Sequence, residues 1–261
     1  MSERVGFSVE EGIATLTLRD PPANTYSYEM MQELDAAILR ARMDEAVHVI
    51  VLRGDGDKFF CAGADIRMLS TAKPAYKYYF CLHANETLNR LEQTPKLVIA
   101  AINGHCVGGG LEVAMAADLR VAKRGKAKIG LPEVSLGVLP GTGGTQRLAR
   151  LVGRSKAIEL MALGTNLSVD EAKALGLVNE LFDEADFDAQ VKAYASRFVP
   201  PNKASKAVGA IKRAVIAGLE VPFESGLSLE RELQQQLFTS EDAKEGIAAY
   251  VDKRTPTFKG R

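Results

Sequence analysis

The sequence predicts an α/β fold, and three observations support that class. Residues 5–18 alternate apolar and polar side chains around a Glu10-Glu11-Gly12 turn, which is typical of a β-hairpin. A helical stretch over 28–42 and a buried-strand run over 47–52 follow, and this strand–helix–strand order favours α/β architecture. From Phe187 onward only helical periodicity remains. We expect this helical tail to pack on the core or against a neighbouring subunit.

The other elements follow from periodicity and turn residues. A helix over about 76–93 is stopped by Pro95, and an uninterrupted apolar run predicts a strand over 97–102. Ser168 and Glu171 have the spacing of a capping box, which predicts the start of another helix. The remaining expected elements are strands at 119–122 and 176–179 and helices up to 152 and over 155–163, 187–197, 203–217, 223–238 and 242–253.

Composition excludes several classes of function. The chain has 261 residues, with 33 basic and 33 acidic side chains, so no bulk field would attract nucleic acid or an anionic membrane. Its three cysteines share no metal-ligand spacing, and their odd number predicts reduced thiols. The first eleven residues lack a signal or transit character, and no apolar run reaches the length of a membrane span. We therefore expect a cytoplasmic protein without a bound metal that contacts neither nucleic acid nor membrane.

The stretch from Asn103 to Asp118 organises the chain. It joins the predicted strand at 97–102 to a helix through three consecutive glycines, Gly108 to Gly110, with Glu112 in the first helical turn. Glycine has no Cβ, so a ligand can approach the backbone there, and N–H groups at a helix start carry partial positive charge. A ligand oxygen that gains negative charge would be stabilised at this turn. The alternative is a tight turn that only packs the helix against the sheet.

Two further pieces extend this chemistry. Small residues over 62–65 again expose backbone N–H groups, and two N–H donors converging on one oxygen would form an oxyanion hole. Glu133 also lies beside glycine-rich backbone, and two carboxylates in different environments can divide acid and base roles. On its own, Glu133 is more typical of a surface loop charge.

Four motifs, in this order and spacing, resemble the crotonase (enoyl-CoA hydratase/isomerase) superfamily over essentially the whole chain. They are Phe60-Cys-Ala-Gly-Ala-Asp-Ile66, Asn103-Gly-His-Cys-Val-Gly-Gly-Gly-Leu-Glu112, Pro132-Glu133 and Leu139-Pro-Gly-Thr-Gly-Gly-Thr-Gln-Arg-Leu148. The resemblance implies a crotonase-type spiral of ββα units over 1–195, carrying the acyl-CoA site. It also implies a C-terminal helical region over 196–261 that serves trimer assembly, giving a homotrimer or a hexamer formed from two trimers.

The resemblance further implies a two-glutamate enoyl-CoA hydratase, which adds water across the double bond of a 2-enoyl-CoA thioester. Ala64 and Gly109 would bind the thioester oxygen through their N–H groups. Glu112 would activate the water, Glu133 would act at the carbon that gains or loses the proton, and Gly141 would contact the water region. The residues expected at the coenzyme A moiety are Ala62, Asp65, Ile66, Tyr250 and Lys253, the last two from either the same chain or a neighbouring subunit. No cofactor is implied beyond the coenzyme A of the substrate.

Two segments depart from the family pattern. Residues 24–28, Asn-Thr-Tyr-Ser-Tyr, stand where many relatives carry Asn-Ala-Leu-Asn, near the coenzyme A entrance, which leaves open whether contacts there are the same. Residues 71–80 lie in the variable region that shapes the acyl pocket and contain four aromatics, Tyr76, Tyr78, Tyr79 and Phe80. We expect these aromatics to be core at helical spacing; the alternative is a wall that restricts the acyl chain or accepts a cyclic one.

Three other functions compete with hydration. An enoyl-CoA isomerase needs only one glutamate, so the carboxylate pair argues against it. An RNA-binding relative would require a basic surface, and the only compact basic run is 123–128. A Ser/His/Asp hydrolase would draw attention to His105 beside the glycine turn, but no Gly-x-Ser-x-Gly elbow accompanies it.

Overall fold

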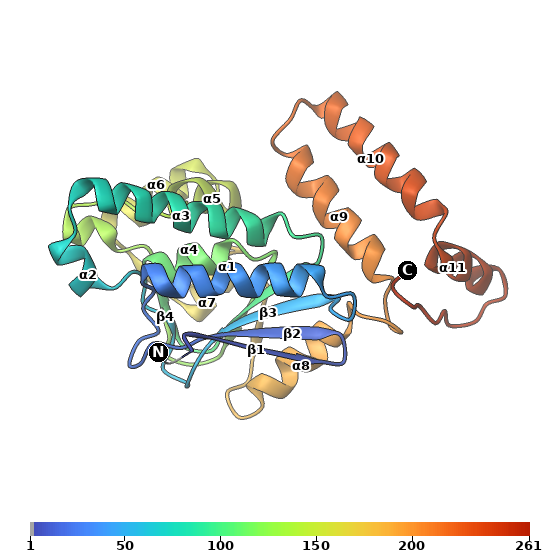
Figure 1. Cartoon of the computed structure of the whole chain (residues 1–261), viewed down its shortest axis with the longest axis horizontal. Helices are drawn as coiled ribbons and strands as arrows, with labels where there is room; N and C mark the ends of the chain where they lie inside the picture. The colour runs from blue at the N-terminus through green and yellow to red at the C-terminus, as the bar shows by residue number, and fades with distance from the viewer. Residues whose placement is uncertain (1–2) are drawn as a thin grey trace.

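In the computed structural model, which describes residues 3–261, two sheets form the centre of the molecule (Figure 1). The larger, six-stranded sheet has the order β1 (Val5–Glu10), β2 (Ile13–Leu18), β3 (Val49–Gly54), β5 (Leu97–Ile102), β7 (Leu119–Lys123) and β10 (Glu180–Phe182). The smaller has the order β4 (Phe59–Cys61), β6 (His105–Val107), β8 (Lys128–Gly130) and β9 (Asn166–Ser168). All neighbours are parallel except β1–β2 and β8–β9.

The helices follow the strands in a repeating pattern. They are α1 (Tyr28–Met43), α2 (Ile66–Thr71), α3 (Pro74–Glu92), α4 (Gly109–Met115), the 3-10 helix η1 (Glu133–Leu136), α5 (Gly144–Val152), α6 (Arg154–Leu163), α7 (Val169–Ala174) and α8 (Phe187–Ser196). Three times the chain runs from the large sheet to the small sheet and then into helix: β3–β4–α2, β5–β6–α4 and β7–β8–η1. This repeat confirms the expected spiral of ββα units.

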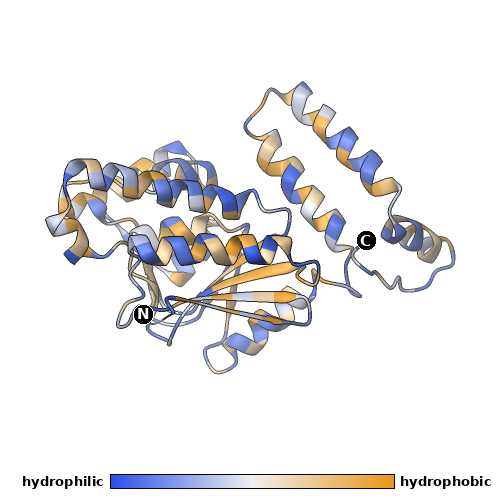
Figure 2. Ribbon diagram, in the orientation of Figure 1, coloured by the Kyte–Doolittle hydropathy of each residue, from blue (hydrophilic) through white to orange (hydrophobic). Residues whose placement is uncertain are grey.

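Alternate residues of the central strand β3 enter two separate cores, because successive side chains of a strand point to opposite faces. Ile50 and Leu52 pack in the larger core, which α1, α3 and α4 share. Val49 and Val51 pack on the other face against Phe187, Val191 and Ala195 of α8. Figure 2 accordingly shows β3 as almost wholly hydrophobic, as expected of a strand buried on both faces.

Most of the predicted elements are confirmed, with shifts of a few residues at their ends. The hairpin turns at Glu11-Gly12, and Ser168 and Glu171 form both bonds of the capping box at the start of α7. The strand expected at 176–179 is wrong. Leu177 and Val178 are buried in a turn after α7. The Asn179 N–H donates to Arg120 O of β7, and strand pairing begins at Glu180. Burial of this apolar pair, rather than strand pairing, explains the pattern.

The aromatic run on α3 is another correction. Phe80 is buried, as expected for a core residue, but Tyr76, Tyr78 and Tyr79 are exposed. The ring of Phe80 stacks with those of Tyr26 and Tyr76, at centroid distances of 5.9 and 6.4 Å. The run therefore contributes one core side chain and one outward stack rather than a buried helical face.

The C-terminal region comprises α9 (Ser205–Gly218), α10 (Phe223–Phe238) and α11 (Glu241–Val251). In Figure 1, α10 and α11 lie beyond α9, away from the sheets. Close backbone packing and one buried ion pair join α9 to the core. A methyl group on Gly209 would lie 2.2 Å from the Pro95 carbonyl oxygen, and Lys212 Nζ lies 2.8 Å from Asp118 Oδ2. Asp118 Oδ2 also accepts the Val98 N–H at 2.7 Å, so this carboxylate ties α9 to β5.

We expect Lys212→Met to lower the free energy of unfolding by about 3–5 kcal/mol, because it leaves the buried Asp118 carboxylate without its cation. Chemical denaturation at matched protein concentration measures the change. Lys206→Met, at an exposed position of the same helix, is the control. Asp118→Asn combined with Lys212→Met should recover much of the loss, because the neutral amide oxygen can still accept the Val98 N–H. A Lys212→Met loss no larger than that of the control would contradict this role.

Candidate active site

Glu112 is buried and rigidly held. It lies in the first turn of α4 and is 2% exposed. Its Oε1 accepts the backbone N–H groups of Thr142 and Gly144, both at 2.7 Å, whereas no residue of 3–261 donates to its Oε2. Burial raises the pKa of Glu112, and these two N–H bonds oppose the rise. One oxygen is thus fixed by the protein, and the other is available to a reactant.

Glu133 has the opposite environment. It begins η1, and its Oε1 would lie 3.2 Å from a methyl group built on Gly108. Its Oε2 is buried and has no hydrogen-bond partner within residues 3–261. Burial, reinforced by the Glu112 carboxylate, raises the pKa of Glu133 to about 7. The interpretation of this residue as a surface loop charge is therefore wrong.

Two backbone N–H groups near these carboxylates have no acceptor among the described residues 3–261. Tyr26 N donates to Gly63 O and Asp65 N donates to Tyr26 O, a parallel bridge that leaves the Ala64 N–H unused. The Gly109 N–H begins α4 and likewise has no acceptor within residues 3–261. A methyl group on Gly63 would lie only 2.9 Å from the Gly109 nitrogen, so the two donor segments are in contact. Their arrangement suits an oxyanion hole.

The prediction that the glycines at 108–110 leave room for a ligand is only partly right. The N–H of Gly109 is free, but a methyl group on Gly109 would lie 2.1 Å from Tyr26 Oη. One on Gly110 would lie 1.9 Å from Cys61 O. The protein itself therefore fills the space beside these two Cα atoms, so they are not open to a ligand. Gly108 adopts φ 56° and ψ −136°, a conformation that favours glycine.

Sequence reasoning missed three side chains of this site, those of Tyr26, Thr142 and Lys77, and the backbone N–H groups of Thr142 and Gly144. Tyr26 is buried, and its Oη lies 3.1 Å from Thr142 Oγ1. Burial, and then Glu112, raise the pKa of Tyr26 well above its usual value. Lys77 of α3 is half-buried and opposes the raised pKa of both glutamates. The Gly144 N–H, like that of Thr142, belongs to the Leu139–Leu148 motif, which signalled the loop but not its bonds to Glu112.

Of the other predicted residues, four lie beside the candidate site and two lie far from it. Ala62, Asp65 and Ile66 flank Ala64, where Asp65 caps α2 by accepting the Arg67 N–H and Ile66 is exposed. The N–H of Gly141 has no acceptor within residues 3–261, and a methyl group on it would lie 3.3 Å from Cys81 Sγ. Tyr250, on α11, and Lys253, just after it, lie at the other end of the molecule from α2 (Figure 1). This chain does not bring them to its own glutamates.

The structure weakens the competing functions. In the basic run at 123–128, Lys123 pairs with Glu184, and Arg124 pairs with Asp170 and Asp183. His105 Nδ1 accepts the Lys128 N–H, which occupies it structurally. In the part of the chain from residue 3 on, no group of His, Cys, Asp and Glu could hold a metal ion, and no helix is long and apolar enough to cross a bilayer.

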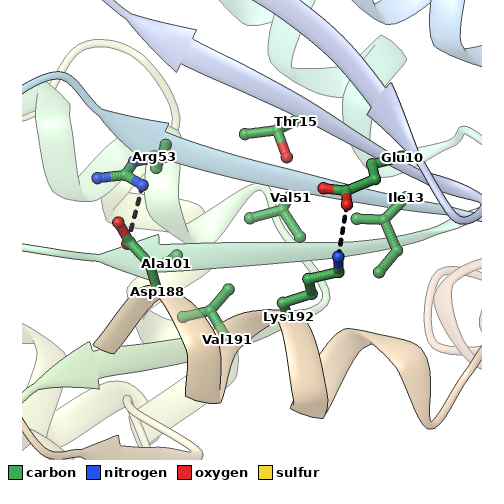
Figure 3. Close-up of a pocket in the computed structure, with 9 residues that line it drawn as sticks. All are labelled: Glu10, Ile13, Thr15, Val51, Arg53, Ala101, Asp188, Val191 and Lys192. Carbon is green, nitrogen blue, oxygen red and sulfur yellow. Dashed lines mark hydrogen bonds and ion pairs between the residues drawn. The ribbon is translucent and has the colours of Figure 1, made fainter. Parts of the chain in front are cut away.

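A separate cavity lies between the six-stranded sheet and α8 (Figure 3). Its charged side chains already pair with one another, Arg53 with Asp188 at 2.8 Å and Lys192 with Glu10 at 2.7 Å. None of the residues predicted for the active site lines it. The candidate site is therefore the glutamate pair with its N–H donors.

Comparisons with known proteins agree with the motifs. The enoyl-CoA hydratase/isomerase family model matches residues 8–261. A probable enoyl-CoA hydratase of Bacillus subtilis strain 168 is 40% identical over 258 residues, covering 98% of each chain. A short-chain-enoyl-CoA hydratase of Clostridium acetobutylicum is 37% identical, covering 94% of this chain and 93% of the relative. An enoyl-CoA hydratase structure from Geobacillus kaustophilus HTA426 has a TM-score of 0.97 at 45% identity, covering 100% of this chain and 98% of that one.

We expect Glu133→Gln to stabilise the fold at alkaline pH. Glu133 has an ordinary pKa of 4.5 and a folded-state pKa of about 7. Between these values the folded chain holds a proton that the unfolded chain has released, so this contribution to stability is complete below pH 4.5 and is lost as the pH rises through 7. At pH 8 the variant should exceed wild type by about 1–2 kcal/mol, after allowance for partial solvent exposure.

Urea unfolding at pH 5 and pH 8 tests this expectation. Glu86→Gln, at an exposed position of α3, is the matched control and should show no such pH-dependent gain. A Glu133→Gln variant whose stability relative to wild type is the same at both pH values would contradict the raised pKa.

Proposed function

Because the chain belongs to the enoyl-CoA hydratase/isomerase family, we propose that it is an enoyl-CoA hydratase. It adds water across the 2,3 double bond of a 2-enoyl-CoA thioester, or removes water in reverse. The observation that supports this most strongly is the pair of glutamates, Glu112 and Glu133, held in opposite environments beside two unused N–H donors. No cofactor takes part beyond the coenzyme A of the substrate.

In this mechanism the thioester oxygen accepts the N–H groups of Ala64 and Gly109. Water adds to C3 while its proton passes to Glu112, whose free Oε2 faces the reactants. The electron pair of the double bond moves onto the thioester as an enolate, which the two N–H groups stabilise by several kcal/mol. Glu133 then supplies the proton to C2. Its pKa of about 7 suits this role, because it is protonated in an appreciable fraction of molecules near neutral pH.

We propose that the coenzyme A moiety binds beside Ala64. Ala62, Asp65 and Ile66 would line its path beside the oxyanion hole, and Gly141 would direct its N–H toward the water. Tyr250 and Lys253 would reach coenzyme A only from a neighbouring subunit, where the lysine suits a phosphate group. The three free cysteines suit a reducing compartment, which we propose is the cytoplasm.

Glu112→Gln and Glu133→Gln should each lower kcat/KM for hydration by about 10²–10⁴-fold, because each removes a group that transfers a proton. Loss of the conjugated thioester absorbance measures hydration of short, medium and cyclic 2-enoyl-CoA substrates. Glu86→Gln is the control. Full activity in both glutamate variants would contradict the mechanism, and consumption of a 3-enoyl-CoA without hydration would identify an isomerase. Binding of RNA across a salt series would instead support the nucleic-acid alternative.

We also propose that the C-terminal region, taken as 196–261, assembles three chains into a trimer and two trimers into a hexamer. Large apolar side chains on and beside its helices are exposed: Leu219, Phe223, Phe238 and Tyr250 are 77%, 76%, 63% and 87% exposed. Figure 2 shows such hydrophobic segments on α9 and α10, away from the core. Exposed apolar surface of this kind is typical of a protein–protein interface.

Light scattering on the purified protein should give a native mass that is three or six times the chain mass of 28.2 kDa. Phe223→Asp should lower this mass, because a charge would be buried in the interface. Glu224→Gln, next to it in sequence, should leave the mass unchanged. A monomeric wild type would contradict the proposed assembly.

A further inference from the structure

The structure assigns a positioning role to Tyr26, which connects both proposed oxyanion donors and one glutamate. We propose that its main chain fixes the Ala64 N–H, that its ring and hydroxyl fix the position of Gly109, and that its hydroxyl orders Thr142 beside Glu112. This inference rests on the proposed hydration and identifies a residue that sets the geometry of that reaction.

The main chain of Tyr26 acts on the first donor. Its N–H bonds to Gly63 O at 2.9 Å, and its carbonyl accepts the Asp65 N–H at 3.1 Å. These two bonds lie on either side of Ala64 in sequence. In a parallel bridge the N–H of the residue between them points the other way, so the Ala64 donor is directed away from Tyr26 and remains free.

The side chain of Tyr26 acts on the second donor. Its hydroxyl occupies the space where a side chain of residue 109 would stand, 2.1 Å from the Cβ that any other residue would carry. The ring is held in place by Phe80, with which it stacks at 5.9 Å, and it is almost fully buried. The start of α4, and therefore the Gly109 N–H, rests against a side chain that packing has immobilised.

The same hydroxyl reaches the glutamate through Thr142. Tyr26 Oη and Thr142 Oγ1 are 3.1 Å apart, and both side chains are buried. The Thr142 N–H donates to Glu112 Oε1 at 2.7 Å, and the Thr142 hydroxyl also opposes the raised pKa of Glu112. Either hydroxyl can donate in the Tyr26–Thr142 hydrogen bond, and the Thr142 N–H holds Glu112, so Thr142 connects Tyr26 to Glu112. Tyr26 stays protonated throughout, since burial raises its pKa.

Tyr26→Phe tests the hydroxyl while it keeps the ring stack on Phe80. We expect kcat for hydration to fall about 10-fold with KM within about 2-fold, because the substrate-binding groups remain but Glu112 is less well ordered. Thr142→Val should lower kcat at least as much. Thr142→Ser, which keeps the hydroxyl, should have a kcat close to that of wild type. Tyr26→Phe combined with Thr142→Val should be no worse than Thr142→Val alone, since both changes break the same hydrogen bond. Tyr194→Phe, on α8 and packed on the other face of the six-stranded sheet, is the control.

A second readout does not depend on turnover. In ¹³C-glutamate-labelled protein, with Glu112→Gln used to assign the resonance, the pKa of Glu112 should rise in Tyr26→Phe and in Thr142→Val but not in Tyr194→Phe. The charged and titratable groups around Glu112 and Tyr26 include Glu133 of η1, Lys77 of α3, Cys61 and Cys81. None of these is altered in Tyr26→Phe.

The two readouts separate the ways in which the proposals can fail. A wild type that hydrates no 2-enoyl-CoA overturns the proposed function, and the titration still decides the role of Tyr26. An unchanged Glu112 pKa in Tyr26→Phe overturns the positioning role even if the enzyme is a hydratase. A loss of kcat that appears only together with a lower unfolding temperature, or additive losses in the double variant, also overturns it.

Discussion

The active-site architecture depends on two backbone hydrogen bonds to a single oxygen, Glu112 Oε1. A buried carboxylate is costly unless it is hydrogen-bonded, and the N–H groups of Thr142 and Gly144 meet that need. The bonds also dictate the loop. A methyl group on Gly144 would lie 2.9 Å from Oε1 and 2.7 Å from Pro140 Cβ, and Gly143 has a φ of 101°. Two glycines are therefore required where the loop enters α5, and α4 and α5 are locked together through one side chain.

The spiral topology explains why groups far apart in sequence meet beside that carboxylate. Strands β4, β6 and β8 are parallel neighbours in the small sheet. Ala64, Gly109 and Glu133 each follow the end of one of these strands. The carboxyl ends of parallel strands lie at one edge of a sheet, where open α/β proteins bind their ligands. Each ββα unit thus contributes one group to the site: a donor, a second donor and a carboxylate.

How far the sequence predicts this structure depends on whether a feature is local. Apolar periodicity and the Ser168–Glu171 spacing located most helices, and the ordered motifs pointed to both glutamates and both N–H groups that the structure brings together in the candidate site. Tyr26 could not be assigned, because its neighbours Gly109 and Thr142 are distant in sequence and its segment departs from the family pattern. The predicted burial of the α3 tyrosines was wrong for a related reason, because helical spacing alone does not show which side of the helix faces the core. Leu177 and Val178 show that apolar pairs can be buried without strand pairing.

The two carboxylates illustrate how one site can prepare different proton chemistry. Glu112 has one oxygen held by two N–H groups, so its orientation is fixed and its negative charge is partly compensated, which suits the base that directs a water molecule. Glu133 is half-buried with an unpartnered oxygen, and the charge of Glu112 adds to the cost of ionising it. Such a group retains a proton near neutral pH and therefore suits the acid. Because the two charges repel, ionisation of one favours protonation of the other. A single proton shared by the pair is the state that the proposed mechanism requires in either direction. In the proposed mechanism the unsatisfied environment of Glu133 has a use: a hydrogen-bond donor placed beside its free oxygen would stabilise the fold and release the proton that this mechanism assigns to Glu133.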